Sequence, residues 1–292
     1  MVKNREYQLG LYEKAMPKEL SWHDKLCFTK EAGFDYLEMS IDETDEKLAR
    51  LDWNYLERLA LKQAVWDTGV AINSICLSGH RRFPLGSHDD QKRQKALKIM
   101  EQAINLAKDL GVRIIQLAGY DVYYENSDDL TKRYFLTNLQ IAVEMAAKNG
   151  IMLGFETMET PFMDTVGKAM TYVEKINNPY LGIYPDIGNL KNASLLYGDS
   201  VHDDLVKGKG HIMAAHLKET TPGHYREIPF GTGHTAFVSN IMTLKSLGVR
   251  LFVGEFWYVG SLTWQEDLKA ANNFLRQKLD QVFVEGESCN EK

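Results

Sequence analysis

The chain has 292 residues and a net charge of −6, with 44% hydrophobic and 25% charged residues. This composition is typical of a globular protein with a sizeable core, and the negative charge argues against nucleic acid as a partner. No apolar run reaches the ~18 residues of a membrane span, and the N-terminus lacks the apolar region of a signal peptide. Cys27, Cys76 and Cys289 are widely spaced, as is typical of reduced thiols. We therefore expect a cytoplasmic protein without membrane contact.

A helix-length polar segment that ends in glycine and leads at once into an apolar strand recurs along the chain. Glycine at such a junction can take the left-handed conformation that ends a helix. With three further apolar segments, the pattern predicts eight strands. The segments that contain them are residues 9–12, 32–39, 68–75, 110–117, 149–156, 180–186, 212–216 and 247–255.

Helical periodicity fills the intervals between these strands. The clearest helix is predicted to begin at Ser87, where Ser87 and Asp90 have the spacing of a capping box, and to end near Leu110. Further helices are predicted over residues 55–67, 131–148, 165–176 and 264–279.

Alternating strands and helices predict a parallel sheet, and eight such units favour a closed (β/α)8 TIM barrel, an α/β fold, over an open doubly wound sheet. No Gly-x-Gly-x-x-Gly follows the first strand, which disfavours a dinucleotide site. Residues 1–284 are predicted to form this single domain, and residues 285–292 a polar tail.

Four consecutive predicted strands each end in a potential metal ligand: Glu156, Asp186, His216 and Glu255. In a TIM barrel the active site lies at the carboxyl ends of the strands, so these side chains should converge. A charge at the end of an apolar strand is costly to bury unless an opposite charge meets it. The set therefore predicts a divalent cation, and Mn²⁺, Mg²⁺, Co²⁺ and Zn²⁺ all suit its ligands. Each residue alone is equally well explained as a surface ion pair or a helix cap.

Polar residues also follow the other predicted strands. They would line a pocket that can hydrogen-bond a polyhydroxylated ligand and offer cations to an anionic end. Six are candidate substrate contacts: Glu38, His80, Tyr120, Asn189, Lys218 and Arg226. Ion pairing is an equal alternative for Glu38 and Lys218, and a loop salt bridge is the favoured interpretation of Arg82.

Several long blocks of the sequence are similar to a known family. They are residues 11–15, 38–40, 42–45, 77–87, 116–124, 184–190 and 216–233. In these blocks the chain closely resembles the L-ribulose-5-phosphate 3-epimerases of bacterial ascorbate and L-xylulose catabolism, which belong to the xylose-isomerase-like barrel superfamily. The resemblance implies a divalent metal held by Glu156, Asp186, His216 and Glu255. Many sugar epimerases of this superfamily carry a histidine three residues after the ligand aspartate, where this chain has Asn189.

The resemblance further implies a reaction, the inversion of C3 of a 2-ketopentose 5-phosphate. The metal would stabilise an enediolate formed when the C3 proton leaves, and a second acidic group would return a proton on the opposite face. Glu156 and Glu255 are the candidates for this acid/base pair, and their pKa values must differ in the complex.

Three alternatives remain at the level of sequence. A metal-dependent phosphodiesterase of the type that cleaves abasic DNA would need several more histidine ligands than His216 and His80. An aldose–ketose isomerase or a dehydratase of an unphosphorylated sugar or inositol derivative could use the same metal and carboxylates. A non-catalytic sugar-binding protein would have no reason to place two glutamates across a metal.

We also expect a homo-oligomer such as a dimer. The aromatic residues Trp22, Trp53, Trp66, Tyr123 and Tyr124 could supply its interface if they are exposed. Packing against the outer helices of the barrel is the favoured interpretation of these residues.

Overall fold

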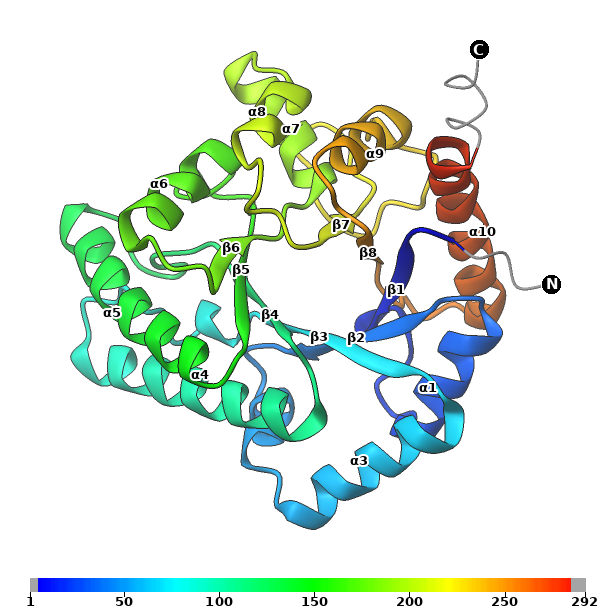
Figure 1. Ribbon diagram of the computed structural model, residues 1–292, viewed down its shortest axis with the longest axis horizontal. Coiled ribbons are helices and arrows are strands. Elements are labelled where there is room, and N and C mark those ends of the chain that lie inside the picture. Colours follow the sequence, from blue (N-terminus) through cyan, green and yellow to red (C-terminus); the bar gives the residue numbers. More distant parts are fainter. Residues whose placement is uncertain (1–4, 285–292) are drawn as a thin grey trace.

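The computed structural model describes residues 5–284, so the predicted polar tail at 285–292 lies outside the described residues. Within that range all eight predicted strands form (Figure 1). They are β1 (Gln8–Tyr12), β2 (Tyr36–Ile41), β3 (Ala71–Leu77), β4 (Ile114–Ala118), β5 (Met152–Glu156), β6 (Leu181–Ile183), β7 (Ala215–Leu217) and β8 (Leu251–Gly254).

The strands pair in parallel in the order β6-β5-β4-β3-β2-β1-β8-β7. Between β6 and β7 two parallel bridges, Ile183 with Ile212 and Asp186 with His216, join the ends of the sheet. The predicted TIM barrel is therefore confirmed. The second bridge also sets two candidate metal ligands side by side.

Helices form the outer layer around the barrel in Figure 1. They are α1 (Trp22–Glu31), α2 (Asp45–Leu48), α3 (Tyr55–Thr68), α4 (Asp90–Leu110), α5 (Asp129–Lys148), α6 (Val166–Ile176), α7 (Ile187–Tyr197), α8 (Val201–Lys207), α9 (Phe237–Ser246) and α10 (Trp264–Phe283), with the short 3-10 helices η1 (Glu13–Ala15), η2 (Ala49–Asp52) and η3 (Gly79–Arg81). The glycine signal holds at α3 and α4, which end at Gly69 and Gly111 with φ of 70° and 79°.

The predicted capping box at Ser87 is wrong. The N-cap of α4 is Asp89, whose carboxylate accepts a hydrogen bond of 2.8 Å from the backbone N–H of Gln91. The Ser87 hydroxyl instead donates to Glu125 at 2.7 Å and accepts from the backbone N–H of Asp89 at 3.0 Å. Helix α4 thus begins two residues later than the cap spacing predicts.

Two apolar layers hold the barrel together. The larger lies between strands and helices, and the smaller fills the barrel interior with residues that include Tyr36, Cys76, Tyr184 and Val253. Gly154 makes room in this interior, because a Cβ there would lie 2.9 Å from the sulfur of Met213. The residues at the strand ends lie directly above this interior layer.

The aromatic residues proposed for an interface differ in exposure. Trp22 and Trp53 pack edge to face at 6.0 Å, and the guanidinium of Arg50 lies 4.8 Å from the Trp22 ring, whereas Trp66 and Tyr124 are 84% and 68% exposed.

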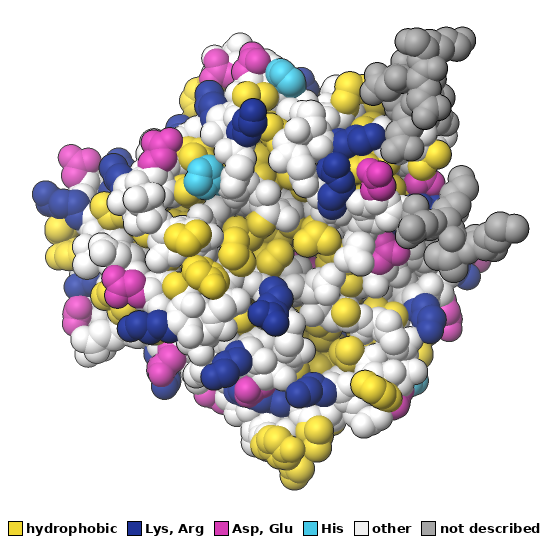
Figure 2. Space-filling model, in the orientation of Figure 1, with side chains coloured by type: hydrophobic (Ala, Val, Ile, Leu, Met, Phe, Trp, Pro, Cys, Tyr) yellow, Lys and Arg dark blue, Asp and Glu magenta, His cyan; other side chains and the backbone are white. Residues whose placement is uncertain are grey.

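Figure 2 shows basic and acidic side chains interspersed over the viewed face, without a broad area of one sign. No helix among residues 5–284 is long and apolar enough to cross a membrane.

Candidate active site

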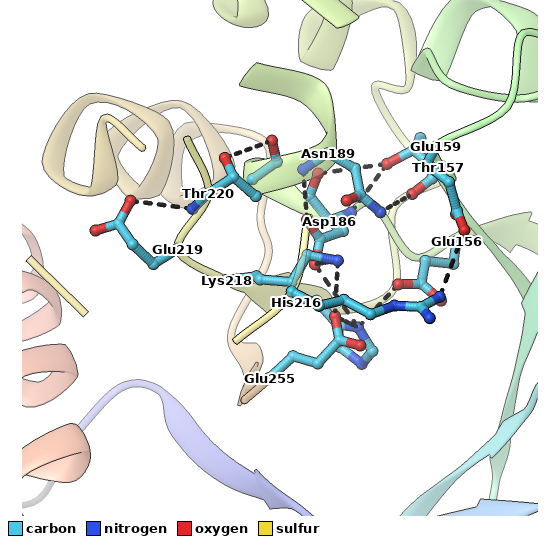
Figure 3. A network of polar contacts seen from close by, with 12 residues as sticks. Glu156, Thr157, Glu159, Asp186, Asn189, His216, Lys218, Glu219, Thr220 and Glu255 are labelled. Carbon is cyan, nitrogen blue, oxygen red and sulfur yellow. Dashed lines mark hydrogen bonds and ion pairs between the residues drawn. The ribbon is translucent and has the colours of Figure 1, made fainter. Parts of the chain in front are cut away.

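The four predicted ligands come together at the carboxyl ends of β5 to β8 (Figure 3). Glu156 ends β5, Asp186 caps the N-terminus of α7 after β6, His216 lies within β7, and Glu255 directly follows β8. Each offers one ligand atom, and these atoms lie within 4.8 Å of one another. All four side chains are buried, so residues up to 99 positions apart form one polar centre in an apolar surrounding.

The imidazole of His216 organises this centre. Its Nδ1 lies 3.3 Å from Glu156 Oε1, 3.1 Å from Glu255 Oε2 and 4.0 Å from Asp186 Oδ2. Its Nε2 faces away and lies 2.6 Å from Glu38 Oε1. Nδ1 is therefore the ring nitrogen available to a cation held by the three carboxylates.

Neighbouring side chains fix the carboxylates. Gln116 Nε2 donates to Glu156 Oε2, and the backbone N–H of Asn189 donates to Asp186 Oδ1 at 2.7 Å. The ammonium of Lys218 lies 3.2 Å from both Asp186 Oδ2 and Glu255 Oε2. The ligand oxygens are thus held in place by groups outside the ligand set.

Burial and neighbouring charges shift the pKa values of Asp186, Glu255 and His216. Burial raises the pKa of Asp186 to about 8; Lys218 opposes the shift, and the carboxylates of Glu255 and Glu156 reinforce it. Burial alone would raise the pKa of Glu255, but Lys218 and His216 hold it well below its usual range. For His216 burial alone would lower the pKa, yet the carboxylates of Glu38 and Glu255 raise it well above its usual value.

The raised pKa values of Asp186 and His216 share an electrostatic contribution. The carboxylates outnumber the cations around them, so protons gather on Asp186 and His216 to balance the charge. A divalent cation would balance the same charge without those protons. Three carboxylates and one imidazole, buried and mutually within reach, fit Mn²⁺, Mg²⁺, Co²⁺ or Zn²⁺.

A pocket opens directly above this centre. Its lining includes both glutamates of the ligand set and, around them, Tyr12, Lys14, Cys76, Ser78, Arg81, Met158, Glu159, Asn189, Lys218, Tyr225, Arg226 and Trp257. Four of these residues are cationic, and most of the others carry a hydrogen-bonding group. Such a lining can accommodate a polar ligand with an anionic end.

Three of the six predicted substrate contacts line the pocket, namely Asn189, Lys218 and Arg226. The predicted position of Glu38 at the end of its strand is wrong. Because β2 continues to Ile41, Glu38 lies in mid-strand, fully buried inside the barrel beneath His216. It faces the imidazole rather than the pocket.

His80 and Tyr120 also lie away from the pocket surface. The turn η3 directs the His80 ring towards α4, where Nε2 lies 3.1 Å from Ala96 O, and burial lowers the pKa of His80 to about 4. The Tyr120 hydroxyl donates to Glu159 at 2.6 Å from behind the pocket wall. Arg81, next to His80 in the chain, lines the pocket instead.

Sequence reasoning missed several lining residues, among them Lys14, Glu159 and Trp257. Two carried a usable signal, because Glu159 and Trp257 follow the strand-end glutamates Glu156 and Glu255 by three and two residues. Arg82, assigned to a loop salt bridge, pairs with Asp45 at 2.6 Å on the surface.

Comparison with known proteins places this geometry in a family. A family model described as a xylose isomerase-like TIM barrel matches residues 27–278. The chain is 47% identical over 245 residues to the L-ribulose-5-phosphate 3-epimerase UlaE of Shigella boydii serotype 18, covering 84% of this chain and 85% of the relative. The UlaE protein of Escherichia coli O157:H7 matches with the same identity and coverage.

Solved structures show the same fold at low sequence identity. An L-ribulose 3-epimerase superposes with a TM-score of 0.76 at 18% identity, covering 98% of this chain and 99% of the other. The D-psicose 3-epimerase of Clostridium cellulolyticum H10, solved with D-tagatose, gives 0.76 at 15% identity and covers 93% and 99%.

The fold, the buried group of ligands and these relatives define an enzyme of the isomerase class, a carbohydrate epimerase on a TIM barrel. Within the xylose isomerase-like barrels, the chain belongs to the L-ribulose-5-phosphate 3-epimerase family.

Proposed function

We propose that the protein catalyses the 3-epimerisation of a ketopentose phosphate, interconverting L-ribulose 5-phosphate and L-xylulose 5-phosphate. The observation that carries this proposal is the convergence of Glu156 and Glu255 with Asp186 and His216 in one buried group. The relatives that are 47% identical to the chain and are named L-ribulose-5-phosphate 3-epimerases support this choice of substrate. Such a reaction belongs to the cytoplasmic catabolism of L-ascorbate and L-xylulose.

In this proposal Glu156, Asp186, His216 and Glu255 hold a divalent cation. When bound, the cation supplies Lewis acid chemistry, polarising the ketone and stabilising the negative charge that develops as C3 loses its proton.

The two glutamates carry the proton chemistry. Inversion requires removal of the C3 proton on one face and delivery of a proton on the other, so the two groups must flank the reacting carbon. Glu156 and Glu255 come from β5 and β8 and approach the same imidazole nitrogen from separate strands, at 3.3 and 3.1 Å. Gln116 and Lys218 hold the two carboxylates in position.

The pocket lining supports a proposal for the remaining contacts. We propose that Asn189, Lys218 and Arg226 bind the sugar, while Lys14 and Arg81 add positive charge for the phosphate. Arg81 stacks on Tyr123 at 4.8 Å and lies near the Tyr120 hydroxyl, at 3.4 Å, which fixes its guanidinium towards the pocket.

The test is solvent deuterium incorporation at C3 of a ketopentose 5-phosphate in D₂O, followed by NMR. We expect incorporation with loss of stereochemical purity, and a strong preference over the phosphate-free ketopentose. Equal rates on the free sugar would instead favour an isomerase of unphosphorylated sugars, and binding without exchange would favour a sugar-binding protein.

The decisive variant is Glu156→Gln, which keeps the shape of the side chain but removes the proton acceptor. We expect turnover to fall by about 10²–10⁴-fold with an unchanged unfolding transition. Glu101→Gln, on the exposed face of α4, is the matched control. Near-wild-type epimerisation by Glu156→Gln with its metal content unchanged would remove Glu156 from the acid/base role.

The dimer remains a proposal. The exposed rings of Trp66 and Tyr124 support it, and light scattering of the purified protein measures the oligomeric state.

A further inference from the structure

A fourth carboxylate lies beneath the candidate metal ligands. Glu38 is fully buried in mid-strand β2, and its Oε1 lies 2.6 Å from Nε2 of His216. This contact is on the side of the imidazole opposite the three ligand carboxylates.

The second oxygen of Glu38 is also fully engaged. Its Oε2 accepts hydrogen bonds from the Ser74 hydroxyl at 2.6 Å and from the Tyr184 hydroxyl at 3.0 Å. The Tyr184 ring packs against the imidazole of His216, with ring centroids 5.0 Å apart and planes at 72°. The carboxylate and the imidazole are therefore held together by Ser74 of β3 and by Tyr184, which follows β6.

This arrangement fixes which nitrogen of His216 is free. A carboxylate can only accept, so Nε2 must carry the hydrogen that it receives. The lone pair of a neutral imidazole is then on Nδ1, the atom that faces Glu156, Asp186 and Glu255.

A purely structural role does not explain the choice of residue. An amide or a hydroxyl could accept the same hydrogen bond, whereas a further buried carboxylate beside three others raises the cost of desolvation. That cost is offset when a divalent cation lies on the other side of the ring, because the carboxylate then increases the basicity of the imidazole.

We infer that Glu38 is a positioning residue for the cation, which orients His216 and holds it as the Nε2–H tautomer with Nδ1 available as ligand. The inference rests on the proposed function, since it assigns Glu38 to the metal site of that reaction.

The test compares cation binding by the wild type, Glu38→Gln and Glu38→Leu, with Co²⁺ as probe and a competing chelator to set the free concentration. We expect affinity to fall by roughly 10–100-fold, less in Glu38→Gln, whose amide oxygen can still accept from Nε2–H, than in Glu38→Leu. The visible absorption of bound Co²⁺ should change in both. Ser74→Ala is the matched control, because it removes one bond to Glu38 but leaves the contact with His216 intact.

A second measurement needs no variant. In the Zn²⁺-loaded wild type, ¹⁵N-edited NMR of the His216 ring should show a slowly exchanging hydrogen on Nε2. A hydrogen on Nδ1 would overturn the inference, as would folded Glu38 variants with wild-type Co²⁺ affinity and spectrum. A wild type that binds neither ion would instead contradict the metal site of the proposed function.

Discussion

Two buried clusters of charged side chains lie at the carboxyl end of the barrel and differ in their charge balance. In the first, the carboxylate of Glu13, the residue after β1, pairs with the side-chain nitrogens of three cations. They belong to Lys25 at 2.7 Å, Lys47 at 2.6 Å and Arg50 at 2.6 Å. In the second, the cations that the three ligand carboxylates and Glu38 face within the described part of the chain are His216 and Lys218. The first cluster has more cations than anions, and the second has more anions than cations.

The charge balance of each cluster is reflected in the pKa values of its carboxyl groups. Burial alone would raise the pKa of Glu13, but Arg50 and Lys47 hold it well below its usual range. In the second cluster burial raises the pKa of Asp186 to about 8, and two neighbouring carboxylates reinforce this shift. Burial of charge by itself therefore does not mark a catalytic centre; an uncompensated excess of carboxylates does.

The largest expected effect on stability comes from the first cluster. Glu13→Gln leaves three buried cations without their carboxylate, so we expect a loss of about 3–5 kcal/mol in the free energy of unfolding. Urea unfolding measures it, and cation affinity should stay at the wild-type value. Weaker Co²⁺ binding by the folded variant would show that the two clusters are coupled, and an unchanged free energy of unfolding would contradict the predicted loss.

A comparable contrast separates the two buried histidines. His80 has no carboxylate partner among residues 5–284, and burial lowers its pKa to about 4, against an ordinary value of 6.5. The fold therefore favours neutral His80: its contribution is complete above pH 6.5 and is lost as pH falls from 6.5 towards 4, by about 3 kcal/mol in total. His80→Gln, whose amide can still donate to Ala96 O, should lack this part of the pH dependence. Parallel stability curves for the two proteins between pH 7 and 4 would contradict the assignment.

The second cluster can be predicted from the sequence because the topology of the barrel determines where its ligands lie. Strands β5 to β8 each carry a ligand at or close to their carboxyl ends, and parallel strands bring these ends to one rim whatever segments connect them. The position of Glu38 was predicted wrongly. The predicted end of β2 is three residues too early, and an error of this size moves a side chain from the rim to the barrel interior. His80 was misplaced because the turn η3, not a strand, sets its direction.

The Glu13 cluster left no pattern in the sequence. Its cations come from α1, α2 and η2, three outer segments, and no sequence periodicity predicts that they meet at Glu13. Ligands fixed by strand register can be predicted from one sequence, whereas partners fixed by helix packing cannot.

Cation binding gives a smaller effect that belongs to the second cluster alone. At about 100 times its Kd, a divalent cation should stabilise the folded state by about 2.7 kcal/mol, because the unfolded chain does not hold the four ligands together. Thermal unfolding with added Mn²⁺ and with a chelator measures the difference. The increment should persist in Glu13→Gln and disappear in Asp186→Asn; an equal increment in both would mean that the cation binds elsewhere.

The smallest effect tests burial directly, using two ion pairs of equal length. Arg50 and Glu13 approach to 2.6 Å with both side chains buried, and Arg82 and Asp45 approach to 2.6 Å with side chains 46% and 90% exposed. Water screens the exposed pair, so Arg82→Ala should cost about 0–1 kcal/mol and its cost should vanish in 1 M NaCl. Arg50→Ala should cost several times more and keep its cost in salt, because the buried carboxylate loses a partner that ions in solution cannot replace. Equal costs for the two substitutions would mean that distance rather than burial sets the strength of these pairs.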